Sequence, residues 1–146
     1  HGGMVAIENS SVTNANATGL AMQGGLGGGV YVASGKLGLI RVDISYARAI
    51  GPTAMGGAIY NRDEVTIVGG TISNTFADGH LSSAGGIWCD AGTLTLSHTA
   101  IANTFASGES ATGGGVFVNT GVVTLINVSI VNSSAVGARA AGGGVF

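Results

Sequence analysis

The segment that decides the fold runs from residue 85 to 103 and contains three short motifs: Gly85-Gly86-Ile87-Trp88, Leu94-Thr95-Leu96 and Ile101-Ala102-Asn103. Within these motifs aliphatic residues alternate with small or polar ones, which is the pattern of a β-strand with one buried face. Glycine and other turn-forming residues separate the motifs. The segment therefore predicts several short strands joined by tight turns.

Each motif returns along the chain at a nearly constant interval. The aliphatic position of the first motif recurs as Val30, Ile59, Ile87, Val116 and Val145, so the steps are 29, 28, 29 and 29 residues. A helical repeat would show a period of about 3.6 residues, and a propeller blade needs about 40–45 residues. The repeat predicts an all-β fold, a parallel β-helix solenoid of about five coils of about 29 residues with three short strands in each coil.

In such a solenoid equivalent residues stack about 4.8 Å apart, so each column of the sequence becomes a ladder along the axis. The aliphatic columns are expected to point inward and their neighbours outward. One column predicts an asparagine ladder at a turn, formed by Asn74, Asn103 and Asn132. Another predicts an outward aromatic stripe suited to a protein or glycan partner, formed by Tyr31, Tyr60, Trp88, Phe117 and Phe146. The alternative for this stripe, and for the shorter pair Phe76 and Phe105, is ladder stacking partly covered by the adjacent glycine-rich loop.

The composition excludes several classes of function. With five Lys and Arg and a formal net charge of −2, the chain cannot form the basic patch that nucleic-acid binding requires. No apolar run approaches the roughly 18 residues that span a bilayer. A single cysteine, Cys89, excludes a disulfide framework and a multi-cysteine metal site. We expect no metal and no cofactor.

The alignment of the repeats also predicts how the chain is organised. Residues 1–146 form a single β-helix segment, and Gly3-Met4-Val5 matches Gly92-Thr93-Leu94, so the first coil is expected to start part-way round. The last coil is expected to stop part-way round at Phe146. Because open solenoid ends recruit other chains, the sequence favours a piece of a longer protein or of a continuous stack. The loop after Gly19 is three residues longer than its equivalents.

One polar cluster is predicted at a turn. His80 and Glu109 are 29 residues apart, Asp78 lies two residues before His80, and Arg139 follows in the next coil. A carboxylate, an imidazole and a guanidinium together suit acid–base chemistry or cation binding, and the alternative is a solvated surface ion pair.

Catalysis of the kind seen in polysaccharide-cleaving β-helices needs several carboxylates on one face, and here the carboxylates fall in different columns. Lys36 and Glu64, and Arg62 and Asp90, are each 28 residues apart, which predicts salt bridges between neighbouring coils instead. The sequence therefore predicts a protein that is not an enzyme.

The order Gly-Gly-aliphatic-aromatic, Leu-Thr-Leu and Ile-Ser-Asn-Thr resembles right-handed β-helix repeats of large surface and secreted proteins. It is similar to the polymorphic outer-membrane protein repeats of chlamydiae, with Gly56-Gly57-Ala58-Ile59 as the matching motif, and to autotransporter-like adhesins. The resemblance implies a right-handed solenoid with a structural or adhesive role at a cell surface, with neighbouring proteins or surface glycans as partners. The alternative is a carbohydrate-binding or non-catalytic part of a carbohydrate-active β-helix protein.

Overall fold

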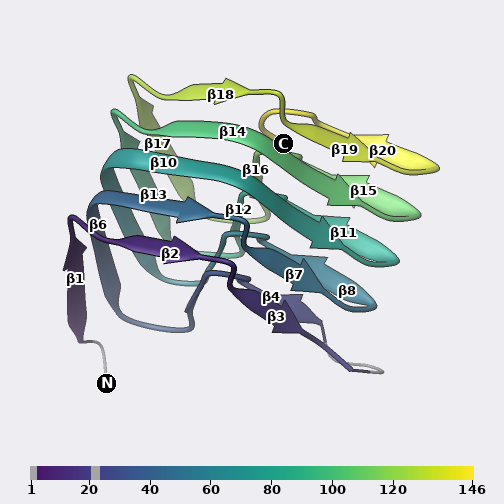
Figure 1. Cartoon of the computed structure of the whole chain (residues 1–146), viewed down its shortest axis with the longest axis horizontal. Helices are drawn as coiled ribbons and strands as arrows, with labels where there is room; N and C mark the ends of the chain where they lie inside the picture. Colours follow the sequence, from purple (N-terminus) through teal and green to yellow (C-terminus); the bar gives the residue numbers. More distant parts are fainter. Residues whose placement is uncertain (1–2, 21–23) are drawn as a thin grey trace.

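The computed structural model describes residues 3–20 and 24–146, and in that part of the chain the strands form three parallel sheets. The long loop predicted after Gly19 falls largely on residues 21–23 and so lies outside the described residues. Neighbouring coils are in strict register: Ile59 pairs with Val30, Ile87 with Ile59 and Val116 with Ile87. The predicted parallel β-solenoid of about five coils, spaced about 29 residues apart, is therefore confirmed, and the coils stack from β1 to β20 in Figure 1.

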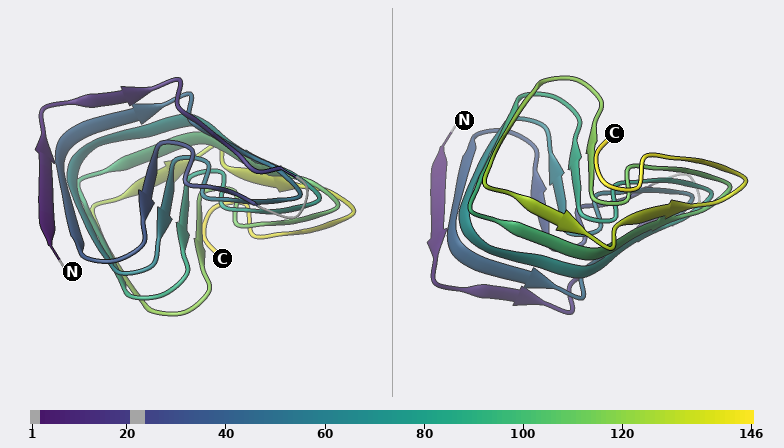
Figure 2. Two further views of the ribbon diagram at one scale, coloured as in Figure 1. Left: turned by 90° about the horizontal axis from the view of Figure 1, so that it is seen from below. Right: turned by 90° about the horizontal axis from the view of Figure 1, so that it is seen from above.

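Each coil has two parts, a wide loop and a narrow projection (Figure 2). We call the stacked wide loops the tube and the stacked projections the spur. The 11-stranded sheet bends at a corner, forms two adjoining walls of the tube and continues into the spur. Its tube strands are β1 (Met4–Glu8), β2 (Ser11–Thr13), β6 (Lys36–Ser45), the first part of β10 (Glu64–Asp78), β13 (Thr93–Ser97), the first part of β14 (Ala100–Ser107), β17 (Val122–Ile126) and β18 (Ser129–Val131).

The spur consists of two limbs. The first limb contains β3 (Asn16–Thr18), β7 (Arg48–Ile50), the ends of β10 and β14, and β19 (Ser134–Val136). The second limb is the five-stranded sheet of β4 (Gly25–Leu26), β8 (Thr53–Met55), β11 (Leu81–Ser83), β15 (Ser110–Thr112) and β20 (Arg139–Ala141). The four-stranded sheet then closes the tube with β5 (Val30–Val32), β9 (Ile59–Asn61), β12 (Ile87–Cys89) and β16 (Val116–Val118).

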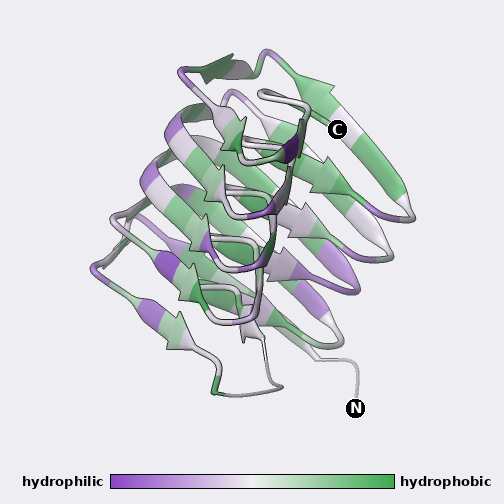
Figure 3. Ribbon diagram, turned by 90° about the vertical axis from the view of Figure 1, so that its right-hand side faces the viewer, coloured by the Kyte–Doolittle hydropathy of each residue, from purple (hydrophilic) through white to green (hydrophobic). Residues whose placement is uncertain are grey.

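The tube is filled by the predicted inward columns. Ile59, Ile87 and Val116 are fully buried, and one continuous cluster joins them to the aliphatic residues of β6, β10, β13 and β14. Burying one Val, Leu or Ile side chain contributes roughly 1.5–3 kcal/mol. Hydrophobic residues occupy equivalent places on neighbouring coils, so that they form bands across the strands in Figure 3. The tube core therefore stabilises the stack along its whole length.

The spur has no room for such side chains. Its interior is a layer of alanine and serine, because Ala49 and Ala77 face Ala54 and Ser82 across a narrow gap, and all four are fully buried. At the tip, a Cβ on Gly79 would overlap the carbonyl oxygen of Gly51 in the coil before. The alanine and glycine columns of the sequence thus define a thin double layer with a sharp turn.

The two limbs meet the tube at a pinched neck. The first glycine of each Gly-Gly motif lies directly against the backbone of the opposite limb; a Cβ on Gly57 would overlap the carbonyl oxygen of Phe76. Thr75 lies at the same level, fully buried, and its hydroxyl donates to the carbonyl oxygen of Gly85 over 2.7 Å. Glycine is required here because a side chain would push the limbs apart.

Candidate functional site

The aromatic column forms a stack that runs through the five coils. The ring centroids of Tyr31 and Tyr60 are 5.3 Å apart, those of Tyr60 and Trp88 6.4 Å, and those of Trp88 and Phe117 4.2 Å. Phe146 continues the stack at 5.4 Å from Phe117. The rings are nearly parallel throughout, with interplanar angles of 6–18°. The in-register strands therefore place every ring of the column against the next one.

The prediction of an exposed aromatic stripe is wrong at the centre of this stack. Tyr60 and Trp88 are each only 6% exposed, while Tyr31 and Phe146 are 47% and 53% exposed. The stack lies in the angle between the tube and the spur, where Met55 and Ala84 pack over its middle. The alternative predicted for this column, ladder stacking with partial cover, therefore describes its middle coils.

A polar network closes the outer edge of the stack. The Tyr60 hydroxyl donates to Asp90 Oδ2 over 3.1 Å, and Arg62 Nε lies 3.3 Å from the same oxygen. Asn119 Nδ2 donates to Asp90 Oδ1 over 3.1 Å. Burial, together with the hydrogen bond to Asp90, raises the pKa of Tyr60 to about 12. The carboxylate of Asp90 is occupied by three neighbours and serves to fasten adjacent coils.

The predicted polar corner is only partly assembled. His80 Nε2 and Glu109 Oε2 are 2.6 Å apart, at the tip of the spur, with both side chains more than half exposed. Among the described residues, neither Asp78 nor Arg139 makes a side-chain hydrogen bond or ion pair. The corner is therefore an exposed contact between two residues on adjacent coils, as in the solvated alternative that the sequence left open.

Two further predictions about contacts between coils are confirmed. Asn103 Nδ2 donates to Asn74 Oδ1 and Asn132 Nδ2 to Asn103 Oδ1, each over 3.3 Å, so the asparagine ladder is present. Lys36 and Glu64 form a 2.7 Å salt bridge that also raises the pKa of the lysine, mainly through the hydrogen bond to Glu64. These polar contacts tie each coil to the next.

The first limb of the spur carries a groove that the sequence prediction did not identify. It has a volume of about 330 Å³ and is lined by the outward side chains of β7, β10, β14 and β19: Arg48, Phe76, Asp78, Phe105, Ser107 and Val136. The rings of Phe76 and Phe105 are stacked with centroids 5.4 Å apart, and the guanidinium carbon of Arg48 lies 5.5 Å from the Phe76 centroid. The sequence did contain an indication of this groove in the column of Ala49, Ala77 and Ala106. If these alanines point inward, the residues on either side of them in each strand must point outward.

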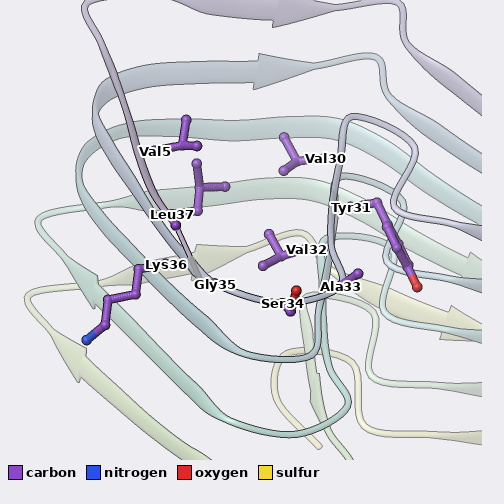
Figure 4. A pocket seen from close by; sticks show the side chains of 10 residues that line it. Val5, Val30, Tyr31, Val32, Ala33, Ser34, Gly35, Lys36 and Leu37 are labelled. Carbon is purple, nitrogen blue, oxygen red and sulfur yellow. The ribbon is translucent and has the colours of Figure 1, made fainter. Parts of the chain in front are cut away.

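A second cavity, of about 360 Å³, belongs to the tube interior beside β5. Val5, Val30, Val32 and Leu37 point into it, whereas Tyr31 and Lys36 point away (Figure 4). The side chains that point into it are aliphatic, so this cavity continues the hydrophobic core.

Cys89 is fully buried beside this core, within hydrogen-bonding distance of Asn61 Nδ2 at 3.7 Å. Burial raises the pKa of the Cys89 thiol above its ordinary value, so the thiol form is favoured at neutral pH. In residues 3–20 and 24–146, no three His, Cys, Asp or Glu side chains come close enough together to hold a metal ion. The same part of the chain contains no helix with the length and apolarity needed to cross a membrane.

In comparisons with known proteins, no protein-family model, no curated protein and no solved structure matches this chain.

Proposed function

We propose that this chain is a non-catalytic structural or adhesive segment of an extracellular or cell-surface protein. The observation that supports this proposal most directly is the aromatic stack, in which every coil contributes one ring to a column along the axis. Stacked aromatic pairs add about 0.5–1.5 kcal/mol each beyond the area that they bury. The side chains of this column are thus used to hold coil to coil.

The polar residues are used in the same way. The Lys36–Glu64 salt bridge, the Asp90 network and the asparagine ladder all join residues 28 to 30 positions apart, which lie on adjacent coils. A solenoid whose coils are joined on several sides resists bending and unravelling. Such a body suits a stalk, a fibre or the display of a surface at a distance from a cell.

Immunogold electron microscopy of the source cells tests this proposal, with an antibody raised against the purified chain. Gold particles along projections or filaments outside the cell are the expected result, and protease treatment of intact cells should remove them. Labelling confined to the cell interior would overturn the surface location and, with it, the structural role proposed there.

Carbohydrate binding is a second candidate function, alone or as the non-catalytic part of a carbohydrate-active protein. One observation favours it: the spur groove brings two aromatic rings together with a carboxylate, a guanidinium and a hydroxyl. Glycan recognition commonly combines apolar and hydrogen-bonding groups in this way.

A further inference from the structure

We infer that the spur groove is a binding site for a neutral glycan, held against Phe76 and Phe105 by hydrogen bonds to Arg48, Asp78 and Ser107. This inference rests on the second candidate function and assigns it a location and a ligand class.

At Phe76 and Phe105 the floor of the groove is the face of a parallel sheet with a paired strand on each side; a free edge of the sheet lies at β19, which pairs with β14 alone. Phe76 pairs with Arg48 on one side and with Phe105 on the other, and Phe105 pairs with Ser134. The backbone groups of these strands are therefore already used in the ladder. An extended peptide recognised by strand addition needs unpaired backbone groups at an edge, so the face at Phe76 and Phe105 does not suit it. Only side chains are available to a ligand here.

The charged residues in the groove stand apart from most others in this chain. Elsewhere a charged side chain usually has a polar partner on the next coil, as Lys36 has Glu64 and Arg62 has Asp90. Among the described residues, the Arg48 guanidinium contacts the Phe76 ring, and neither it nor the Asp78 carboxylate has a hydrogen-bond or ion-pair partner. A donor and an acceptor are thus both open to a ligand beside the phenyl rings.

The balance of these groups selects the ligand. One cationic and one anionic side chain cancel in net charge, so the groove does not favour an anion or a cation. The Phe76 ring lies between Phe105 and the Arg48 guanidinium, so a pyranose ring meets the outer edges of the stacked phenyl rings with its C–H groups. Its hydroxyl groups then face Arg48, Asp78 and Ser107. The volume of about 330 Å³ lies at the lower end of the range for small-molecule sites, which fits one or two sugar residues.

The test is a glycan array probed with the purified chain, followed by calorimetric titration of the best neutral oligosaccharide and by NMR of the aromatic protons. We expect binding to a neutral glycan, with shifted proton signals from Phe76 and Phe105. Arg48→Gln and Asp78→Asn should each weaken binding about tenfold or more, because a hydrogen bond to a charged group is lost. Arg139→Gln is the matched control, since Arg139 is also exposed and without a polar side-chain partner among the described residues but does not line the groove.

Each other outcome overturns the inference in a different way. Glycan binding that both groove variants leave unchanged would place the carbohydrate site elsewhere on the chain. Absence of binding to every glycan on the array would remove the carbohydrate function together with its site. Self-association abolished by the groove variants, measured by analytical ultracentrifugation, would assign the groove to a second copy of this chain.

Discussion

Replacing Trp88 tests whether the aromatic stack holds the coils together. The Trp88 ring is 6% exposed, lies 4.2 Å from the Phe117 ring and is inserted between two neighbours of the stack. Trp88→Ala should therefore lower the free energy of unfolding by about 3–5 kcal/mol, the usual cost of truncating a buried tryptophan. Trp88→Phe keeps the stack, and phenylalanine already occupies this position in the following two coils.

The indole nitrogen makes the comparison sharper. Within the described residues, Trp88 Nε1 is a buried nitrogen without a hydrogen-bond partner, which costs about 1–3 kcal/mol. Trp88→Phe removes this unsatisfied group while it gives up part of the packing. We expect the two effects to offset each other, so that Trp88→Phe remains within about 1 kcal/mol of the parent.

Urea unfolding of the three proteins, followed by circular dichroism, measures the difference. The slopes of the transitions should agree, so that the midpoints report stability. The reasoning would be refuted if Trp88→Phe were as unstable as Trp88→Ala, because restoring an aromatic ring to the stack would then add no stability. A Trp88→Ala variant as stable as the parent would refute it as well.

Three other perturbations test separate parts of the structure. Tyr46 occupies the position of the asparagine column and has a positive φ of 55°, close to the 54° of Asn74 and Asn103. Asparagine adopts this backbone conformation more readily than tyrosine, so Tyr46→Asn should stabilise the chain by about 1–2 kcal/mol in thermal unfolding. Tyr46→Ala should not stabilise it. Gly79→Ala should destabilise the chain by about 1–3 kcal/mol, because its Cβ would overlap the Gly51 carbonyl oxygen. The control is Gly38→Ala, whose Cβ would lie 3.9 Å from its nearest neighbour and which should be neutral or stabilising. Equal effects of the two substitutions would contradict the geometry of the tip. The pKa of Tyr60 is raised from 10.0 to about 12, so the protonated phenol stabilises the fold; this contribution is complete below pH 10 and is lost as the pH rises toward 12. Tyr60→Phe should flatten that decline in unfolding free energy, and an unchanged decline would exclude Tyr60 as its source.

The tube was predictable because its columns are strongly apolar. Residues such as Ile59, Ile87 and Leu94 alternate with small or polar neighbours, and the step of 28 or 29 residues stacks them on one another. Hydrophobic burial at these positions is large enough to fix both the register and the direction in which each side chain points. Periodicity alone therefore identified the coil, its repeat and the asparagine ladder at its corner.

The spur was harder to predict for a physical reason. The second limb of the spur has Ala54, Ser82 and Ala111 as its inward residues, and these give no aliphatic signal in the sequence. The two motifs represented by Val65 and Ile72 both lie on β10, in the same sheet, so the three predicted motifs do not correspond to three separate sheets.

The aromatic column illustrates the same limit. Period-2 alternation indicates on which side of β12 the Trp88 ring lies, but it does not reveal that Met55 and Ala84 of the spur cover that side. Cover of this kind depends on where the chain turns at the neck. The neck glycines, such as Gly57 and Gly85, recur with the Gly-Gly motif, but their period does not reveal which backbone they lie against.

The small interior of the spur bears on its role. An alanine methyl group contributes about 0.8 kcal/mol when buried, whereas an isoleucine or leucine of the tube contributes roughly 1.5–3 kcal/mol. The spur therefore adds little hydrophobic stability for each residue that it orders, and the tube would close without it because the limbs leave and rejoin the tube at the Gly57 neck. The spur does add an outer face, to which successive coils contribute pairs of side chains such as Phe76 and Asp78. This face contains the groove. A projection of low intrinsic stability that is repeated in every described full coil is more readily explained by the surface that it presents than by support of the core.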